Sequence, residues 1–214
     1  MIELWGRKNA YNVQKVLWIL AELELDYTHH DVGSRPGDLE TPEFIAINPH
    51  ARIPVLIDAG RVLWESNSIL RYLAASYSHN TLWPADPWER SQAERWMDWE
   101  LSKLQEDFIA LFWGYFRTPE TQRDWEVIEQ ARIRCANHMR QLDQHLARHK
   151  FLAGDRFTMG DIPCAVCLFR YFNLGLEVEK PENLLAWYRC LGDRPGYRST
   201  VMVPFHELSG RTNY

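Results

Sequence analysis

Residues 48–73 read NPHARIPVLIDAGRVLWESNSILRYL, and this stretch is the most informative about the fold. Its two short apolar runs, Pro54–Asp58 and Arg61–Trp64, flank Ala59-Gly60, a spacing typical of a β-hairpin. Ser66 is a favoured N-cap residue, and apolar residues recur at helical spacing after it. The stretch therefore predicts two strands followed by a helix.

The residues before this stretch predict a strand, a helix and a second strand. Apolar and polar residues alternate over the short segment Ile2–Trp5 and again over Tyr27–Val32. Between them, Val13–Leu23 places its apolar residues on one helical face. Pro36–Pro49 is rich in turn-forming residues, so we expect a loop with at most a short helix near Glu43–Ile47. The order up to residue 77 is thus β-α-β, loop, β-β-α.

The residues after this stretch are predicted to be helical. Residues 78–87 are polar and contain two prolines, which is typical of a linker. Trp88–Phe116 and Gln122–His149 are long amphipathic runs. We therefore expect an α/β domain over residues 1–77 and an all-helical domain over residues 88–214.

A further helix start is marked by Thr158 and Asp161. Thr158 is a good N-cap, and the Asp161 carboxylate lies three residues later, where it can reach back to the amide of the cap. This pair predicts a structural cap without a catalytic role. Shorter helices are expected at Leu184–Leu191 and after Pro195.

Composition and charge exclude several classes of function. The chain has 214 residues, of which 46% are hydrophobic and 25% charged, and its formal net charge is -5. A negative net charge without a basic block argues against nucleic-acid partners and anionic membranes. No apolar run is long enough to span a membrane, and the chain begins on a strand pattern without a leader sequence, so we expect a cytoplasmic protein.

The four cysteines do not predict a metal or redox site. Cys164 and Cys167 have the C-x-x-C spacing, but they fall inside an apolar helical run from Ile162 to Phe169. Cysteines in such a run are usually small core residues. We expect no metal.

The element order and four local motifs resemble the cytosolic glutathione S-transferase family, in particular its theta-like and nu-like members. Residues 48–56 resemble the family loop NPxGxVPxL, and residues 65–73 resemble its E-S-x-x-I…Y-L signature. Residues 151–162 resemble the capped helix of the second domain, and residues 187–197 resemble the segment W-Y…R-P-x-Y. The resemblance spans nearly the whole chain. It implies a thioredoxin-like N-terminal domain that binds glutathione and an all-helical domain that offers the second substrate.

The resemblance also implies which residues bind glutathione. The family has a cis bond before the proline that matches Pro54, so the backbone of Ile53 is expected to pair with the cysteinyl backbone of glutathione. The γ-glutamyl group is expected at Glu65 and Ser66, where the start of a helix attracts a carboxylate. Arg52 resembles a basic residue often found near the glycyl carboxylate, although an exposed charge is the equally good alternative.

The chain departs from the family pattern where the thiol is activated. The serine-type pattern S-x-N-x-x-K-V matches Ala10-Tyr11-Asn12-Val13-Gln14-Lys15-Val16, so alanine stands where the family has the activating hydroxyl. Three groups are candidates to replace that hydroxyl. We rank the Asn12 side chain first as the catalytic group, the backbone amides of the helix start second, and the Tyr11 hydroxyl third.

The expected function is conjugation of the glutathione thiolate to a small electrophile. Tyr11 and Trp113 are expected to line the second-substrate pocket. Phe112, Trp113 and Phe116 form an aromatic stripe whose spacing is usual for core residues, and a stacking site for the electrophile is the alternative. A glutathione-dependent disulfide reductase or peroxidase, or a non-catalytic glutathione-binding protein, is the alternative that Ala10 leaves open. The family forms homodimers, and Trp96, Met97 and Trp99 supply more apolar surface than one subunit readily hides.

Overall fold

A four-stranded mixed sheet organises the first part of the chain. The computed structural model describes residues 1–212. The strands are β1 (Ile2–Trp5), β2 (Tyr27–His30), β3 (Val55–Asp58) and β4 (Arg61–Trp64). Their order is β2-β1-β3-β4, with β1 parallel to β2 and antiparallel to β3, and β3 antiparallel to β4. The predicted hairpin is confirmed. β2 is shorter than expected because its ladder ends where Trp5 pairs with His30, just before the chain turns at Gly6.

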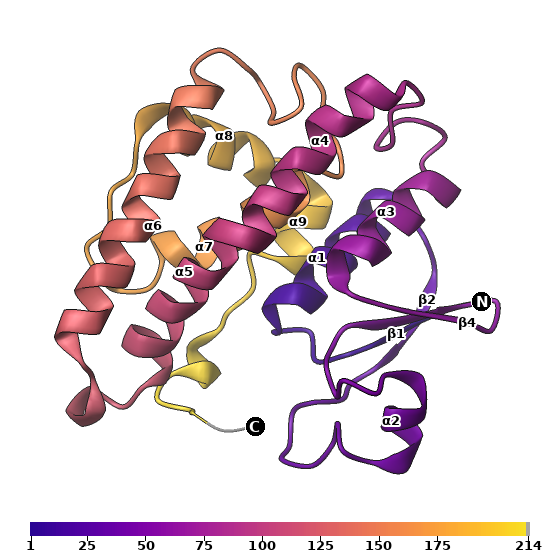
Figure 1. Ribbon diagram of the computed structural model, residues 1–214, viewed down its shortest axis with the longest axis horizontal. Coiled ribbons are helices and arrows are strands. Elements are labelled where there is room, and N and C mark those ends of the chain that lie inside the picture. The colour runs from indigo at the N-terminus through magenta and orange to yellow at the C-terminus, as the bar shows by residue number, and fades with distance from the viewer. Residues whose placement is uncertain (213–214) are drawn as a thin grey trace.

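Three helices accompany this sheet: α1 (Tyr11–Glu22), α2 (Pro42–Ile47) and α3 (Ser66–Tyr77). In Figure 1, α1 and α3 lie on one side of the sheet and α2 on the other. Two features stabilise the short α2. The hydroxyl of its N-cap residue, Thr41, accepts from the Phe44 amide, and the Phe44 side chain is buried. These elements form the expected thioredoxin-like domain.

The second part of the chain is helical (Figure 1). Its segments are α4 (Pro87–Trp99), η1 (Glu100–Leu104), α5 (Gln105–Leu111), η2 (Phe112–Arg117), η3 (Glu120–Gln122), α6 (Trp125–Leu146), α7 (Asp161–Phe172), α8 (Glu182–Gly192), α9 (Pro195–Thr200) and η4 (His206–Leu208). The expected helix over 88–116 is continuous, but η1 and η2 have π-helical geometry. The start expected at Gln122 is wrong. The helix begins at Trp125 because Asp124 caps it, accepting from the amides of Glu126 and Val127.

The predicted contact between the Asp161 carboxylate and the Thr158 amide forms, but the expectation that Thr158 is the N-cap of α7 is wrong. The Asp161 carboxylate accepts from the amides of Thr158 and Leu152 at 2.8 Å each, and the Thr158 hydroxyl accepts from the Gly160 amide at 3.2 Å. Gly160 takes the N-cap position instead, two residues later than expected. Burial raises the pKa of the Asp161 carboxyl to about 7.

Cys164 and Cys167 are fully buried in α7, as expected for core residues. Burial raises the pKa of both thiols, which opposes thiolate formation. Among the described residues, no group of three or more His, Cys, Asp or Glu side chains is arranged to hold a metal ion. No helix within residues 1–212 is long and apolar enough to cross a membrane.

The two parts pack together through α1. Trp18 of α1 is fully buried, and its ring centroid lies 4.7 Å from that of Tyr197 in α9. At the end of the same helix, Glu22 forms an ion pair with Arg194 at 2.5 Å. These contacts hold α1 against the helical part of the chain.

Candidate active site

One end of the sheet gathers the segments that carry the predicted site residues. Trp5 pairs with Val55, and Val55 pairs with Trp64. The end of β1, the start of β3 and the end of β4 therefore lie side by side. The loop that leads into α1, the segment before β3 and the start of α3 all leave the sheet at this end.

A cavity of about 460 Å³ opens between this end of the sheet and the helical part. Ala10, Tyr11 and Asn12 line it from α1, and Ile109 and Trp113 line it from α5 and η2. Arg7, Arg35, Arg52, Ile53 and Glu40 are also among its lining residues. Its size is typical of a small-molecule site.

The start of α1 presents unpaired amides to this cavity. Ala10 holds the N-cap position, and its side chain makes no capping hydrogen bond. The first helical hydrogen bond runs from the Gln14 amide to the Ala10 carbonyl. The preceding amides of the first turn therefore lack helical partners, and they carry the positive end of the helix dipole. An anion placed here would be stabilised.

Asn12 is the second residue of α1 and lines the cavity. It is not the cap of the helix, because Ala10 holds that position. Its Oδ1 atom is buried and has no hydrogen-bond partner among residues 1–212. A buried amide oxygen without a partner costs about 1–3 kcal/mol, and such groups in native proteins often have a functional reason.

Tyr11 contributes to the cavity wall, but its hydroxyl is engaged elsewhere. The hydroxyl donates to Glu100 Oε1 at 2.8 Å, across the boundary between the two parts of the chain. Burial, together with the negative charge of Glu100, raises the pKa of the Tyr11 hydroxyl well above its ordinary value. The structure therefore disfavours Tyr11 as a donor to a ligand in the cavity.

The segment before β3 is held by the buried side chain of Asn48. Its Nδ2 donates to the Arg52 carbonyl at 2.8 Å, and its Oδ1 accepts from the His50 amide at 3.1 Å. The Ile53–Pro54 peptide bond is cis. Arg52 is exposed and lines the cavity beside Ile53.

A glycine at residue 6 lets the loop before α1 pass close to this segment. A Cβ atom there would lie 2.6 Å from Val13 Cγ2 and 3.2 Å from Ile53 Cβ, and the backbone has φ of +145°. The loop, the helix start and Ile53 can approach one another only because residue 6 has no side chain.

The opposite wall is aromatic. Trp113 is 39% exposed and lines the cavity, with the Arg117 guanidinium 3.9 Å from the centroid of its ring. Phe112 and Phe116 are buried and stack on each other at 5.3 Å, as expected for core residues. The aromatic cluster is thus divided between the core and the cavity.

Comparison with known proteins identifies the family. Residues 12–76 match the family model described as "Glutathione S-transferase, N-terminal domain", and residues 126–190 match "Glutathione S-transferase, C-terminal domain". Glutathione S-transferase GstB of Escherichia coli K12 is 41% identical over 206 residues, which cover 95% of this chain and 99% of GstB. The chain belongs to the glutathione S-transferase family. It is accordingly a glutathione-dependent transferase, with glutathione as its co-substrate.

Other glutathione S-transferases support the same assignment. Glutathione S-transferase 3 of Zea mays is 31% identical, over 94% of this chain and 93% of the relative. A theta-class glutathione S-transferase from Xanthomonas axonopodis pv. citri, solved with glutathione bound, superposes with a TM-score of 0.91. It is 42% identical, and the match covers 95% of this chain and 98% of that protein.

In this glutathione S-transferase, Glu65 and Ser66 lie at the same end of the sheet as the cavity but are not among its lining residues. The expectation that Ser66 is the N-cap of α3 is wrong. Ser66 is the first helical residue, while Glu65 takes the N-cap position with φ of +70°. This left-handed conformation is strained for a residue with a side chain, and strain of this kind is concentrated at functional sites. Ser66 is buried and Glu65 is exposed.

Sequence reasoning missed several residues of the transferase cavity. Ile109 lines it next to Trp113, and Arg7 and Arg35 line its other side. Ile109 precedes Trp113 by four residues on one helical face, so the spacing carries a usable signal. Arg7 and Arg35 belong to irregular loops, whose positions follow no sequence periodicity.

Proposed function

We propose that this transferase binds glutathione along the end of the sheet and conjugates its thiolate to a small electrophile. The observation that carries the proposal is the start of α1, where uncapped amides and Asn12 meet the cavity. Ile53 lies on the sheet side of that cavity and Trp113 on the helical side. One molecule bound between them would bring its thiol close to a second substrate.

The proposed orientation of glutathione follows the order of segments along the sheet end. The Ile53 backbone would pair with the cysteinyl unit, and Arg52 would attract the glycyl carboxylate. The γ-glutamyl carboxylate would bind at Ser66 and the free amides of α3, with the ammonium at Glu65. Among described residues, the Glu65 side chain makes no capping hydrogen bond, which leaves its carboxylate available.

Asn12 and the first-turn amides of α1 would stabilise the thiolate. The amide group of Asn12 can donate to sulfur, and the helix start adds a fixed positive potential. Tyr11 supports this assignment indirectly, because its hydroxyl is bound to Glu100. Asn12 is therefore our candidate catalytic residue, ahead of the amides acting alone.

The second substrate would bind on the aromatic side of the cavity. The rings of Tyr11 and Trp113 and the side chain of Ile109 would contact an apolar or aromatic electrophile. The thiolate would form a C–S bond with the electrophilic carbon. In a substitution a leaving group departs with its electron pair, and in an addition a π bond of the electrophile breaks and a neighbouring atom takes up a proton. Detoxification would be the corresponding role.

A second candidate is glutathione-dependent reduction of disulfides or peroxides. The observation in its favour is Ala10, which leaves the α1 start without a hydroxyl that would hold the thiolate. A less stabilised thiolate is still able to attack a sulfur or oxygen atom with a good leaving group. The third candidate is a protein that binds glutathione without catalysing a reaction.

Three parallel assays with purified protein separate these functions. The protein and glutathione are tested against a chloronitroaromatic, cumene hydroperoxide and hydroxyethyl disulfide. We expect conjugation of the chloronitroaromatic above the uncatalysed rate. Turnover of the peroxide or disulfide alone would favour the second candidate, and glutathione binding without turnover in any assay would contradict both enzymatic functions.

We also propose a homodimer, on grounds that differ from the sequence argument. Met97 is fully buried, and Trp96 packs with its ring 4.7 Å from that of His145, so these residues are accommodated within one subunit. Apolar surface instead remains on the edge strand β4, where Val62 is 44% and Trp64 36% exposed. An exposed edge strand with apolar side chains is normally covered.

Sedimentation at micromolar concentration tests the dimer. We expect about twice the 25.3 kDa mass of one chain. Trp64→Glu should shift the protein toward the monomer, whereas Trp125→Glu, at a more exposed tryptophan on α6, should not. A wild-type mass near 25.3 kDa would contradict the proposal.

The free cysteines support a location in a reducing compartment. Cys135, Cys164 and Cys167 are buried free thiols. Free thiols are usual in the cytoplasm, where disulfides are rare. We therefore propose a cytoplasmic location.

A further inference from the structure

The peptide just before α1 is held from the helical part of the chain. Arg170 of α7 has a guanidinium whose Nη2 donates to the Asn9 carbonyl at 2.6 Å and to Gln14 Oε1 at 3.0 Å. Asn9 precedes the N-cap residue Ala10, and Gln14 belongs to the first turn of the helix. One arginine from a distant part of the chain therefore contacts α1 on both sides of its N-cap.

The Asn9–Ala10 peptide is fixed at both of its polar atoms. Its carbonyl accepts from Arg170, and its N–H, which belongs to Ala10, donates to the Arg7 carbonyl at 3.0 Å. Because a peptide is planar, two such hydrogen bonds fix its orientation. Ala10 follows with φ of -82° and ψ of 134°, and these angles direct the first amides of the helix. The direction of the amides that meet the cavity containing Asn12 thus depends on Arg170.

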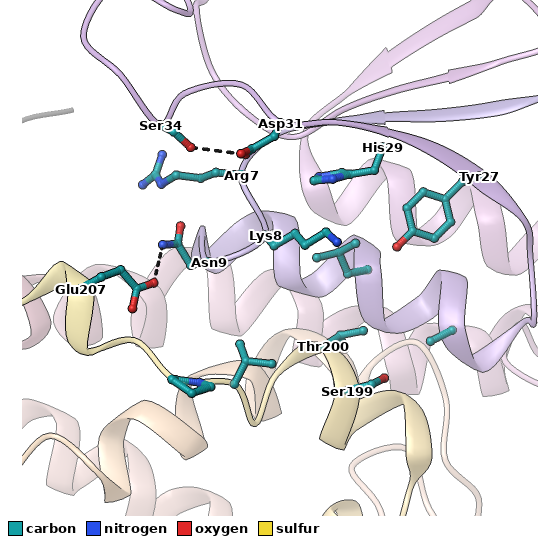
Figure 2. Close-up of a pocket in the computed structure, with 14 residues that line it drawn as sticks. Arg7, Lys8, Asn9, Tyr27, His29, Asp31, Ser34, Ser199, Thr200 and Glu207 are labelled. Carbon is teal, nitrogen blue, oxygen red and sulfur yellow. Dashed lines mark hydrogen bonds between the residues drawn. The ribbon is translucent and has the colours of Figure 1, made fainter.

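The side chain of Asn9 is held as well. Its Nδ2 donates to Glu207 Oε1 at 2.8 Å, and this contact joins the loop before α1 to η4 (Figure 2). The segment that contains η4 is attached in turn to η2, because Arg117 Nε donates to the Arg211 carbonyl at 2.6 Å. Asn9 is therefore held from two sides, by α7 through its carbonyl and by η4 through its side chain.

The Arg170 guanidinium is itself well fixed. The residue is only 4% exposed, and its Cζ lies 5.2 Å from the ring centroid of Phe112 and 5.8 Å from that of Phe205. Both rings are buried. A guanidinium packed against two aromatic rings has little freedom to reorient. Its positive charge lies close to the start of α1 and has the same sign as that end of the helix dipole.

The alanine at the N-cap explains why the turn needs this support. Serine, threonine, asparagine or aspartate at an N-cap accepts from an amide of the first turn and orders the turn locally. Ala10 makes no such bond. Contacts to the preceding peptide order the turn from outside and leave the first-turn amides free for a ligand.

We propose that Arg170 and Glu207 are positioning residues of the transferase reaction. They hold the Asn9–Ala10 peptide, and with it the first-turn amides and Asn12, in the orientation that stabilises the glutathione thiolate. Neither residue lines the cavity that contains Asn12, so both act through Asn9. This inference rests on the thiolate site proposed above.

The test compares glutathione binding with thiolate formation in full-length variants. Arg170→Met removes both hydrogen bonds and keeps an unbranched side chain. We expect the calorimetric Kd for glutathione to change less than about threefold, while kcat with the chloronitroaromatic falls about tenfold or more. The ultraviolet absorbance of the bound thiolate at about pH 7 should fall about two- to fivefold, because the pKa of the bound thiol rises by about 0.5–1. Arg170→Lys keeps the charge and a donor, so it should recover part of both losses.

Glu207 offers a matched pair of variants that separates the contact from the charge. Glu207→Gln keeps an oxygen that can accept from Asn9, whereas Glu207→Ala removes it. Both variants lose one negative charge, so any electrostatic effect on the thiolate is common to them. We expect the thiolate absorbance of Glu207→Ala to be about twofold lower than that of Glu207→Gln. Glu207 is exposed, so both variants should fold even if Arg170→Met does not.

Asp143→Ala controls for a general loss of stability. Asp143 accepts from the amides of Asn183 and Leu184 at the start of α8 and does not line the cavity that contains Asn12. Its removal should lower the thermal stability but leave kcat and the thiolate absorbance at their wild-type values.

Three results would overturn the positioning role. They are a wild-type thiolate absorbance in folded Arg170→Met, equal absorbance in the two Glu207 variants, and the same loss of absorbance in Asp143→Ala. A wild-type protein that binds glutathione without any thiolate absorbance would instead contradict the proposed thiolate site, before any variant is compared.

Discussion

Lys15 Nζ lies 2.9 Å from Glu100 Oε2, and neither side chain is exposed to solvent. This buried ion pair joins α1 of the sheet domain to η1 of the helical domain. Lys15 also donates to Gln105 Oε1 at 2.9 Å, and Glu100 accepts from the Tyr11 hydroxyl. The network lies directly behind the start of α1, so it fixes the position of the turn that carries Asn12.

Breaking one side of this pair should destabilise the fold. Lys15→Met leaves the Glu100 charge buried without its cation, which we expect to lower the free energy of unfolding by about 3–5 kcal/mol. Lys15→Met/Glu100→Gln removes both charges and keeps an acceptor for Tyr11, so it should be more stable than Lys15→Met. Urea unfolding of the wild type and both variants measures this. A double variant less stable than Lys15→Met would contradict the role given to the uncompensated charge.

Tyr11 and Asn12 are neighbours, yet their substitution should affect different properties. Tyr11→Phe removes the hydrogen bond to Glu100 and should lower stability by about 0.5–3 kcal/mol, with little change in thiol chemistry. Asn12→Ala removes the proposed donor and should lower kcat/KM by about tenfold or more, by comparison with loss of an oxyanion donor. Steady-state kinetics and thermal unfolding of both variants give the comparison. The opposite pattern, with Tyr11→Phe inactive and Asn12→Ala active, would make Tyr11 the activating residue.

Glutathione affinity should depend on Ser66 more than on other serines of α3. Ser66→Ala removes a hydrogen bond to the charged γ-glutamyl group, worth about 1.5–3 kcal/mol, which corresponds to about ten- to a hundredfold in Kd. Ser68→Ala is the matched control, because Ser68 is exposed on the same helix. Calorimetry measures both affinities. Equal Kd values for wild type and Ser66→Ala would contradict the proposed orientation of glutathione.

The fold was largely predictable from local patterns, whereas the site was predictable only in part. Alternation, helical spacing and turn residues act over a few positions, so they located the hairpin of residues 54–64 and the helices α1 and α3. The N-cap of α3 was misassigned because serine, the residue at position 66, is a type favoured at N-cap positions. The strained backbone of Glu65, which takes that position instead, depends on the tertiary structure around it.

Contacts between distant residues explain the remaining differences. Lys15 and Val16 set the register predicted for the α1 start, but nothing local indicates that Tyr11 bonds a residue 89 positions away. Similarly, Asp124 was not recognised as a cap, since the polar run before α6 offers several alternatives. A second cavity is lined by the loop that carries Lys8 and by residues 199–207, and these distant segments come together only when the chain is packed.

The last prediction concerns Ala10, where the chain departs from the family pattern. Without a hydroxyl there, the proposed site would stabilise the bound thiol through Asn12 and the α1 start alone. A helix end contributes at most about 2 kcal/mol in partly buried sites, which equals about 1.5 pKa units. A thiol with an ordinary pKa of about 8.5 would then titrate near about 7. Because the thiolate is the reactive form, conjugation should rise steeply with pH between about 6 and 8.

Ala10→Ser restores a hydroxyl at the N-cap of α1 and should change this profile. The hydroxyl can donate to the thiolate, which lowers the pKa of the bound thiol, so conjugation should increase most below about pH 7. The affinity for glutathione should change little, because the gain is in the ionised state of the thiol. The serine should also cap the helix and stabilise the protein by about 0.5–2 kcal/mol.

Ala10→Gly is the control, since glycine is accepted at an N-cap but provides no hydroxyl. The measurements are the pH dependence of kcat/KM and the ultraviolet absorbance of the bound thiolate. If Ala10→Ser matched Ala10→Gly in both, residue 10 would lie outside reach of the sulfur, and the register proposed for this turn would be wrong.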